Sequence, residues 1–559
     1  MTAPIVSEGR APEFADRPVP AVLNAVPLRS RGPAAGMVAG LCGLGVGELA
    51  SGLLDKASPI VSVGNSVIDH VPGSVKRFAI STFGTNDKQA LITGILIITV
   101  LYAALVGTLA ARRLWWGLAG VAGFGAIGVW AGVTGRTGTG GNAAPVIVAA
   151  VVAAAVLYLL MGPAGRSAGR SARPTDGRAA VRLAESMLPT GRVAGLDRRR
   201  FVTGSAAAVG VAGVATLWGR SLQRNGKVVA ARAKVADAGL PAAADPLPPV
   251  APAATAPVPG MAPFITPNAD FYRIDTALAV PRVDPDTWRL KITGLVDHPL
   301  TISYKELLAR PLVEHDCTLM CVSNEVGGDL VGNARWLGVP LGDLLREAGI
   351  RPEATQLVGE SVDGWTGGFP TAVALDGRQA LVAVAMNGET LPFKHGFPAR
   401  LVIPGIYGYV SATKWLSEIR LNRLEDEDGY WIPRGWSKLA PIKTQSRIDR
   451  IAMQRLDPSA PNALRVGPAF VAGVAWAQHR GIAKVEVRVD DSPWRVANLA
   501  ALDQVDTWRQ WWLPWNATTG RHTISVRATD TSGATQPEQR SDPAPDGATG
   551  WHTIGLKVG

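Results

Sequence analysis

Cysteine is scarce in this chain of 559 residues, which contains only Cys42, Cys317 and Cys321. Three cysteines cannot form the disulfide framework of a small secreted protein, so cysteine usage does not reveal the redox compartment. Histidine is scarce as well, and none of the seven histidines lies inside an apolar run. Because a membrane haem commonly takes histidine ligands, and no C-x-x-C-H motif is present, we expect no haem. Electrons would then leave through a separate electron-transfer protein.

Long apolar runs are confined to the first third of the chain, which is rich in Ala, Gly, Val and Leu. Four of them approach the roughly 20 residues that a helix needs to cross a bilayer. We expect these helices at 33–54, 89–111, 114–133 and 143–162. The first is the weakest, because it is glycine-rich and contains Glu48, and a buried or re-entrant helix is the alternative there. A shorter fifth run covers 201–218.

The net charge of +11 is concentrated in places that argue against a nucleic-acid partner. Nine arginines between 166 and 200 accompany only three acidic residues, in a segment flanked by apolar runs. This is the positive-inside pattern of a cytoplasmic loop. The arginines of the N-terminal tail and the pair Arg112-Arg113 fit the same orientation. Five crossings would place everything after Trp218 outside the cytoplasm, in a multi-pass protein of the cell membrane.

The junction before the fifth run combines Asp197-Arg198-Arg199-Arg200-Phe201-Val202 with a weakly hydrophobic segment. This combination is typical of a twin-arginine export signal, and an ordinary Arg-flanked transmembrane helix is the alternative. The expected order is a cytoplasmic tail at 1–32, a four-helix membrane region at 33–162, an Arg-rich cytoplasmic loop at 163–200 and the fifth helix at 201–218. An Ala/Pro-rich stretch at 219–262 follows, which we expect to be an extended spacer.

The stretch His315–Leu341 holds two of the three cysteines, and Ser323-Asn324 with two glycines follow Cys321. A thiolate displayed from such a loop suits a soft metal ion or a nucleophile. From spacing alone, C-x3-C equally predicts a disulfide or two small buried side chains. A helix is expected after it, at Leu341–Ala348.

Short strands mixed with helices predict an α+β domain at 263–438, with strands at 288–294, 356–361 and 380–386 and a hairpin turn at Asn387-Gly388. Within it, His395, Arg400 and Lys414 offer a donor, a bidentate guanidinium and a point charge, which together could clamp a phosphate. Each alone is more often a surface charge. Alternating segments from 439 to 559 predict a C-terminal β-sandwich.

The C-x-S-N loop with its W-L-G-V-P segment, the run HGFPxR…PG…KW, and the later G-V-A-W and V-E-V-R-V-D segments resemble the sulfite oxidase family of molybdopterin-dependent oxidoreductases. The resemblance covers 263–559. It implies one molybdenum-molybdopterin cofactor, with Cys321 as the metal ligand and Cys317 not a ligand. It implies an immunoglobulin-like dimerisation domain at the C-terminus, and hence a possible homodimer. The catalytic residues would be Cys321, Arg273, Arg434 and Trp436, and the cofactor contacts would be Phe271, Tyr272, Arg273, Ile274, Asp275, Asp363, His395, Arg400, Ala412, Thr413 and Lys414.

Three departures from the family pattern concern the substrate. Glu325-Val326 replace an arginine pair, Arg273-Ile274-Asp275 replaces R-N-H, and Trp436 stands where a tyrosine is expected, unless Tyr430 takes that place. An aspartate in the pocket is expected to repel sulfite. The sequence therefore predicts oxygen-atom transfer to or from a small oxyanion or oxide. A reductase of S- or N-oxides and a non-catalytic membrane-tethered binding protein are the alternatives.

Overall fold

The computed structural model of the chain describes residues 28–72, 75, 82–83, 87–136, 140–161, 198–223, 226–452 and 466–559. Most of the predicted cytoplasmic tail and almost all of the Arg-rich loop lie outside these residues. The chain forms two compact units. The first contains 1–48, 96–127 and 147–217, and the second contains 49–95, 128–146 and 218–559.

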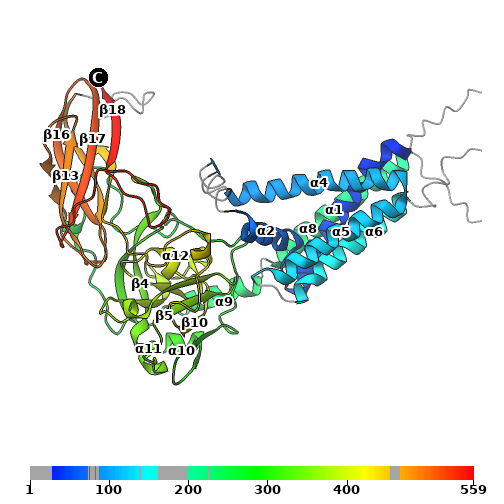
Figure 1. Cartoon of the computed structure of the whole chain (residues 1–559), viewed down its shortest axis with the longest axis horizontal. Coiled ribbons are helices and arrows are strands. Elements are labelled where there is room, and N and C mark those ends of the chain that lie inside the picture. The colour runs from blue at the N-terminus through cyan, green and yellow to red at the C-terminus, as the bar shows by residue number, and fades with distance from the viewer. Residues whose placement is uncertain are drawn as a thin grey trace, which may run out of the picture. The chain divides into compact units, whose positions relative to one another are not determined.

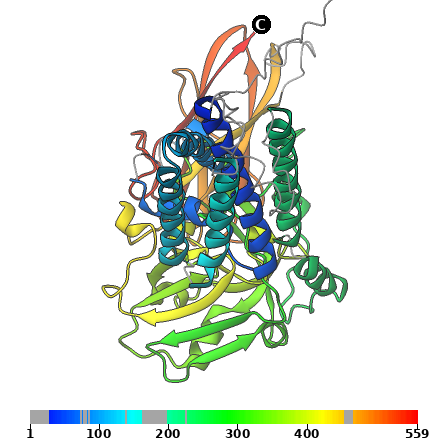
Figure 2. The ribbon, with the colours of Figure 1, turned by 90° about the vertical axis from the view of Figure 1, so that its right-hand side faces the viewer.

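Apolar helices, most of whose residues belong to the first unit, lie side by side (Figures 1 and 2). They are α1 (Leu28–Leu54), α4 (Asp87–Arg112), α5 (Leu114–Thr134), α6 (Ala143–Met161) and α8 (Arg198–Gln223). Small residues permit close packing, since a Cβ atom on Gly107 would lie 2.0 Å from the carbonyl oxygen of Gly32. Close approach through glycine is a common way for membrane helices to associate. The four helices expected between 33 and 162 are therefore confirmed as helices.

Among the described residues, α1, α4, α5 and α6 are long and apolar enough to cross a membrane. Helix α8 is not one of these four, although its 26 residues would reach about 39 Å at 1.5 Å per residue. A membrane crossing by α8 thus stays a prediction. Helix α2 (Pro59–His70), which belongs to the second unit, was not expected from the sequence.

Two five-stranded sheets form the larger part of the second unit. The first has the order β2-β1-β10-β5-β6, with β1 parallel to β10. The second has the order β3-β4-β7-β8, with β9 paired to β7. Helices between the strands complete the expected α+β domain. The bounds are β1 (Arg289–Gly294), β2 (Leu300–Ser303), α10 (Tyr304–Leu308), β3 (Val313–Met320), β4 (Val331–Pro340), α11 (Leu341–Ala348), β5 (Gln356–Ser361), β6 (Thr366–Pro370), β7 (Leu381–Met386), β8 (Glu389–Thr390), β9 (Arg400–Val402), α12 (Gly408–Ser411) and β10 (Leu416–Asn422).

Local sequence signals explain several of these elements. In β1, Leu290 and Ile292 are buried while the residues between them are not, as period-2 alternation requires. Helix α10 begins with a capping box between Ser303 and Glu306, a device worth about 1 kcal/mol. The β7–β8 turn has left-handed backbone at Asn387 (φ 54°) and Gly388 (φ 77°), as the predicted hairpin needs.

The C-terminal part contains two four-stranded antiparallel sheets, of order β11-β12-β16-β15 and β14-β13-β17-β18. Val471 and Trp511 from the first sheet and Val487 and Ile524 from the second are fully buried in one shared core. The predicted β-sandwich is thereby confirmed. The bounds are β11 (Gln445–Ala452), β12 (Gly467–Trp476), β13 (Ile482–Val489), β14 (Arg495–Val496), β15 (Asn498–Leu499), β16 (Arg509–Ala517), β17 (Gly520–Asp530) and β18 (His552–Val558).

The Ala/Pro-rich stretch at 219–262 is not the extended spacer that we expected. It contains α9 (Gly226–Asp237), and its later part packs on the sheets of the same unit. The amide of Ala244 donates to the carbonyl of Leu312 at 2.7 Å, and the amide of Ala256 donates to Oε1 of Gln510 at 2.8 Å. Small apolar side chains allow this, because Ala254 and Ala256 fit into buried positions with little loss of side-chain entropy.

Candidate active site

A cavity of about 750 Å³ in the second unit collects most of the residues that the sequence singled out. Its walls come from segment 271–276, the loop after β3, the turn η6 (Phe393–His395), α12 and the turn η7 (Ile432–Arg434). The expected site residues that line it are Phe271, Tyr272, Ile274, Asp275, Cys321, Asp363, His395, Arg400, Ala412, Lys414, Arg434 and Trp436. Of the other two, Thr413 is fully buried and Arg273 pairs with Asp275; neither is among the described residues that line the cavity.

Cys321 directly follows β3 and opens a tight loop. Its amide donates to the carbonyl of Leu330 at 2.9 Å, and Oδ1 of Asn324 accepts from the amide of Leu330 at 2.8 Å. These bonds hold the thiol at the cavity wall. Burial raises the pKa of the Cys321 thiol, while hydrogen bonds from Ser323 oppose the rise. A soft metal ion would bind the thiolate and displace the proton.

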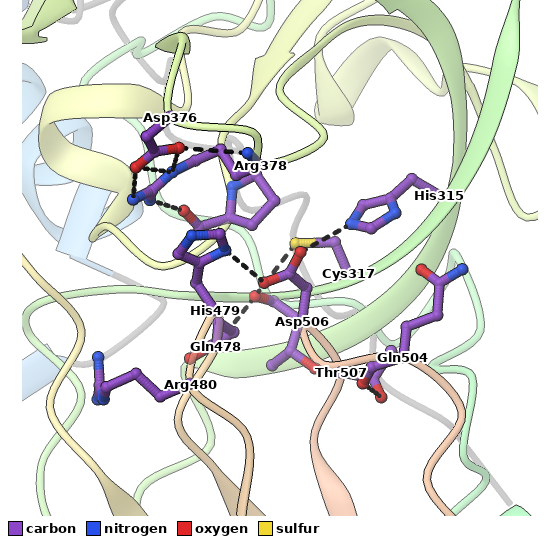
Figure 3. Close-up of polar contacts among 12 residues, drawn as sticks. His315, Cys317, Asp376, Arg378, Gln478, His479, Arg480, Gln504, Asp506 and Thr507 are labelled. Carbon is purple, nitrogen blue, oxygen red and sulfur yellow. Dashed lines mark hydrogen bonds and ion pairs between the residues drawn. The ribbon is translucent and has the colours of Figure 1, made fainter. Parts of the chain in front are cut away.

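Cys317 has a different environment, although it lies only four residues earlier on β3. Its fully buried side chain lies beside Asp506, and His315 and His479 approach the same carboxylate (Figure 3). Burial, and then the negative charge of Asp506, raise the pKa of Cys317 well above its usual range. Both cysteines are free, so the disulfide alternative is wrong. Cys317 does not line the cavity, in keeping with its expected absence from the metal shell.

Arg400 is a buried cation at the start of β9, with 4% of its surface exposed. Its guanidinium donates to the carbonyls of His395 at 3.2 Å and Leu401 at 3.4 Å, and lies 4.9 Å from the ring centroid of Trp336. Burial lowers the pKa of Arg400 to about 10, so the group remains charged at neutral pH. In the described part of the chain no carboxylate forms an ion pair with it. Such a cation is suited to binding an anion.

His395 lies beside Arg400 and is also buried. Burial, together with the positive charge of Arg400, lowers the pKa of His395 to about 3. The imidazole is therefore neutral. Its Nε2 lies 3.0 Å from the carbonyl oxygen of Asn268, which assigns the proton to Nε2 because a carbonyl can only accept. Nδ1 is then an acceptor, and a bound phosphate would have to raise the pKa of this ring before Nδ1 could donate.

Asp275 is the centre of a charge cluster that the sequence did not reveal. Its carboxylate lies 2.5 Å from Nζ of Lys414, 2.5 Å from Nζ of Lys88 and 2.8 Å from Nε of Arg273. Although burial opposes ionisation, the three cations hold the pKa of Asp275 well below its usual range. Burial lowers the pKa of Lys414 to about 8, and Asp275 opposes that shift. One negative charge thus faces three positive charges, and the expectation that Asp275 repels an anion is wrong.

Aromatic side chains form another wall of the cavity. Trp431 and Trp436 lie 6.4 Å apart between ring centroids, and Tyr409 lies 5.7 Å from Trp436. Tyr430 does not line the cavity within the described residues, and its hydroxyl donates to Asp69 at 3.1 Å. Of the two residues considered for the position of the family tyrosine, Trp436 is therefore the one at the cavity.

Sequence reasoning missed several residues that line the cavity. The loop at 542–545, from the C-terminal part of the chain, contributes Asp542, Pro543, Ala544 and Pro545. Trp365 follows Asp363 in the loop before β6, and its amide donates to Oδ1 of Asp363 at 3.2 Å. No local signal marks the loop at 542–545, because only tertiary folding brings it more than a hundred residues back to Trp436.

The residues present fit a molybdopterin cofactor. No group of three or more His, Cys, Asp and Glu side chains that could hold a metal ion occurs among the described residues. A metal at Cys321 would therefore need most of its ligands from a cofactor, as a pterin dithiolene provides. The anionic group of that cofactor would find Arg400, a buried cation held only by carbonyls and an aromatic ring.

Several known proteins and one family model are similar to parts of this chain. Residues 277–431 match the family described as "Oxidoreductase molybdopterin binding domain". The mitochondrial sulfite oxidase of Rattus norvegicus is 29% identical over 317 residues, covering 49% of this chain and 58% of that protein. The chain therefore spans less than two thirds of that relative. The crystal structure of the sulfane dehydrogenase SoxCD from Paracoccus pantotrophus is similar over 55% of this chain and 84% of that chain, with 23% identity and a TM-score of 0.45.

A bacterial relative is identical to this chain at more than a third of the matched positions and is covered over more than two thirds of its length. The uncharacterized oxidoreductase YuiH of Bacillus subtilis (strain 168) is 36% identical over 153 residues, which are 27% of this chain and 74% of that protein. The chain belongs to the sulfite oxidase-like family of molybdopterin-binding oxidoreductases.

Proposed function

We propose that this protein is a membrane-anchored, extracytoplasmic enzyme that transfers an oxygen atom at a molybdenum centre ligated by Cys321 and passes electrons to a separate protein. The observation that carries the proposal is the convergence of Cys321, Arg400, His395 and Lys414 on one cavity. A thiol and an uncompensated buried guanidinium meet the two main needs of the cofactor, a soft ligand and an anion site.

The bound cofactor would supply the two-electron redox chemistry of oxygen-atom transfer. The chain's own residues bind it and exclude water. Arg400 holds the anionic group, Lys414 is positioned beside it by its ion pair with Asp275, and Cys321 holds the metal. Phe271, Tyr272, Ile274, Asp363 and Ala412 would complete the contacts, with Arg273 and Thr413 supporting them from outside the cavity lining.

Arg434 is the candidate for holding the substrate. Its guanidinium lies 3.7 Å from the ring centroid of Tyr430 and donates to the carbonyl oxygen of Asp69 at 3.2 Å. No carboxylate forms an ion pair with it within the described residues, so its charge can attract a small oxyanion. The aromatic wall of Trp431 and Trp436 favours the second candidate, reduction of a neutral S- or N-oxide, because apolar rings suit a less charged substrate.

The charge distribution and the structure support the proposed topology. Under the five-crossing arrangement the loops after α1 and after α5 lie outside, on the side of everything after Trp218. The same segments, 49–95 and 128–146, belong to one compact unit with 218–559. We further propose that 263–438 is the molybdopterin domain and that 439–559 is an immunoglobulin-like domain, through which a homodimer could form.

Metal and pterin analysis tests the proposal. The full chain, purified in detergent, is expected to contain one molybdenum per polypeptide. Cys321→Ser should retain pterin but lose turnover, since a protonated hydroxyl is a poor molybdenum ligand, while Cys317→Ala should keep its activity. Absence of molybdenum from the wild-type protein would favour the non-catalytic binding protein, and full activity in Cys321→Ser would overturn the assignment of the ligand.

The two substrate classes are separated by running the enzyme in both directions. Sulfite oxidation with an artificial electron acceptor is compared with reduction of small S- and N-oxides by an artificial donor. Arg434→Gln should impair turnover of an anion more than that of a neutral oxide. Efficient sulfite turnover that depends on Arg434 would identify a small oxyanion as the substrate. Turnover of neutral oxides alone would identify the protein as a reductase of S- or N-oxides.

A further inference from the structure

Three residues at or near the ends of helices contact the walls of the cavity. Asp69 lies in the last turn of α2, Lys88 lies in the first turn of α4 and Arg136 lies two residues after α5, and all three belong to the compact unit that contains the cavity. We call them the outer-loop clamp. None is accounted for by the cofactor site, and the part of the chain that carries them lies outside the matched family domain.

The clamp contacts backbone and side-chain atoms of residues 275–277 at the first cavity wall. Nζ of Lys88 lies 2.5 Å from Oδ1 of Asp275 and donates to the carbonyl of Ala277 at 2.8 Å. Arg136 donates from its guanidinium to Oγ1 of Thr276 at 2.8 Å. The clamp thus fixes three consecutive residues, of which Asp275 and Thr276 line the cavity.

The same clamp reaches the second wall. Asp69 lies 3.0 Å from Nε of Arg136, and its other contacts are the hydroxyl of Tyr430 at 3.1 Å and the guanidinium of Arg434, which donates to its carbonyl at 3.2 Å. Arg136 also lies 4.7 Å from the ring centroid of Tyr430. The Asp69–Arg136 pair therefore connects Thr276 on one wall with Arg434 on the other, and also holds Tyr430, which is not among the described residues that line the cavity.

The ion pairs of the clamp are largely buried, and this strengthens their effect compared with ion pairs at the surface. The side chains of Asp69 and Arg136 are 12% and 16% exposed, and that of Asp275 is 5% exposed. Ion pairs at such sites are screened less than exposed ones, and removing one partner leaves the other charge buried and unpaired. Loss of a single member should therefore loosen the wall that it holds.

We propose that the outer-loop clamp positions the two walls of the cavity and so controls how substrate enters and binds. Segments 49–95 and 128–146, which belong to the same compact unit as the cavity, are then part of the active-site architecture. This inference rests on the proposed function for its substrate, whereas the contacts that carry it are independent of that function. Asp69, Lys88 and Arg136 are positioning residues, because they act on the cavity through Asp275, Thr276 and Arg434.

The test uses the full chain in detergent micelles with Lys88→Met, Arg136→Gln and the charge-conserving Lys88→Arg. Lys56→Met is the matched control, because Lys56 is an exposed cation in the loop between α1 and α2. Molybdenum content, kcat and KM are measured for the substrate class found active. Amide hydrogen exchange is measured over 273–277 and 430–436.

We expect Lys88→Met and Arg136→Gln to keep molybdenum and to raise KM more than they lower kcat. Exchange over 273–277 should be about tenfold faster in both variants, the factor expected for the loss of one charge-assisted hydrogen bond. Exchange over 430–436 should be faster in Arg136→Gln, because Arg136 also holds Asp69 and Tyr430. Lys88→Arg should restore both values, and Lys56→Met should change neither. Unchanged exchange and KM, or an equal effect of Lys56→Met, would overturn the clamp. A wild-type protein without molybdenum or turnover would instead overturn the proposed function, and the exchange measurement would still decide on the clamp.

Discussion

Arg400 offers the sharpest test of the anion site. Its pKa falls from 12.5 to about 10 because the guanidinium is buried. At about 1.4 kcal/mol for each pH unit, keeping this charge buried without an anion costs about 3 kcal/mol. Under the proposed assignment this cost would be recovered when a phosphate binds, and Arg400 would be a preorganised anion site that favours the loaded protein over the empty one.

Replacement by alanine removes both the charge and its planar pair of donors. Two charge-assisted hydrogen bonds of about 1.5–3 kcal/mol each correspond to a loss of roughly 10² to 10⁴ in cofactor affinity. Arg400→Lys keeps a cation but not the bidentate geometry, and should lie between the wild type and Arg400→Ala. Arg420→Gln is the matched control, because Arg420 pairs with Glu427 at 2.9 Å and does not line the cavity.

Molybdenum and pterin are measured in each variant, purified under identical conditions, together with the thermal stability of loaded and cofactor-free protein. The loaded wild type should be more stable than its cofactor-free form by several degrees, and Arg400→Ala should lose that difference. Full cofactor occupancy in Arg400→Ala would refute the placement of the anion site. Equal depletion in Arg420→Gln would show that the loss reports a damaged fold and not a lost contact.

One further prediction rests on the structure, and two rest on the distribution of arginines in the sequence. The pKa of His395 is about 3 in the folded protein, against an ordinary value of 6.5. As the pH is lowered, the unfolded chain therefore binds a proton at this residue before the folded protein does. The free energy of unfolding should fall by about 2 kcal/mol between neutral pH and pH 5 for this reason. Denaturant unfolding should show this loss in the wild type and a smaller one in His395→Gln. A reporter fused after residue 230 should be active only outside the cytoplasm, and one fused near Arg178 only inside; the opposite pattern would invert the topology. Replacing Arg198 and Arg199 with Lys should retain molybdenum-loaded protein in the cytoplasm. Unchanged export would show that these arginines only set the orientation of the helix in the membrane and are not an export signal.

Elements with strong local signals were predictable from the sequence. The helix at Leu341–Ala348 and the strand at Gln356–Ser361 have the expected bounds, because their apolar periodicity is complete within the segment. No strand was predicted at the positions of β3 and β4. Their cysteine, glycine and asparagine residues weaken the local strand signal, and pairing between Val313–Met320 and Val331–Pro340 stabilises them instead.

Some residues of the candidate site were likewise predictable from local sequence, and others were not. Cys321, His395 and Arg400 belong to short motifs, so the sequence identified them before any fold was known. Asp275 was misjudged, because its effect on an anion depends on Lys88 and Lys414, which come from segments about 140 to 190 residues away. A single sequence shows the charge of a residue but not the charges that folding places beside it.

The cations around the cavity differ in the groups that hold them. Lys414 is engaged by a carboxylate, whereas Arg400 and Arg434 are held by carbonyl oxygens and aromatic rings. Carbonyls and rings orient a guanidinium without neutralising it, so these two arginines keep their attraction for anions. Arg400 comes from the motif to which the resemblance assigns the cofactor, and Arg434 comes from the segment beside Trp436. A cofactor anion and a substrate oxyanion can thus be bound by separate charges, and a change at one arginine should leave binding at the other largely intact.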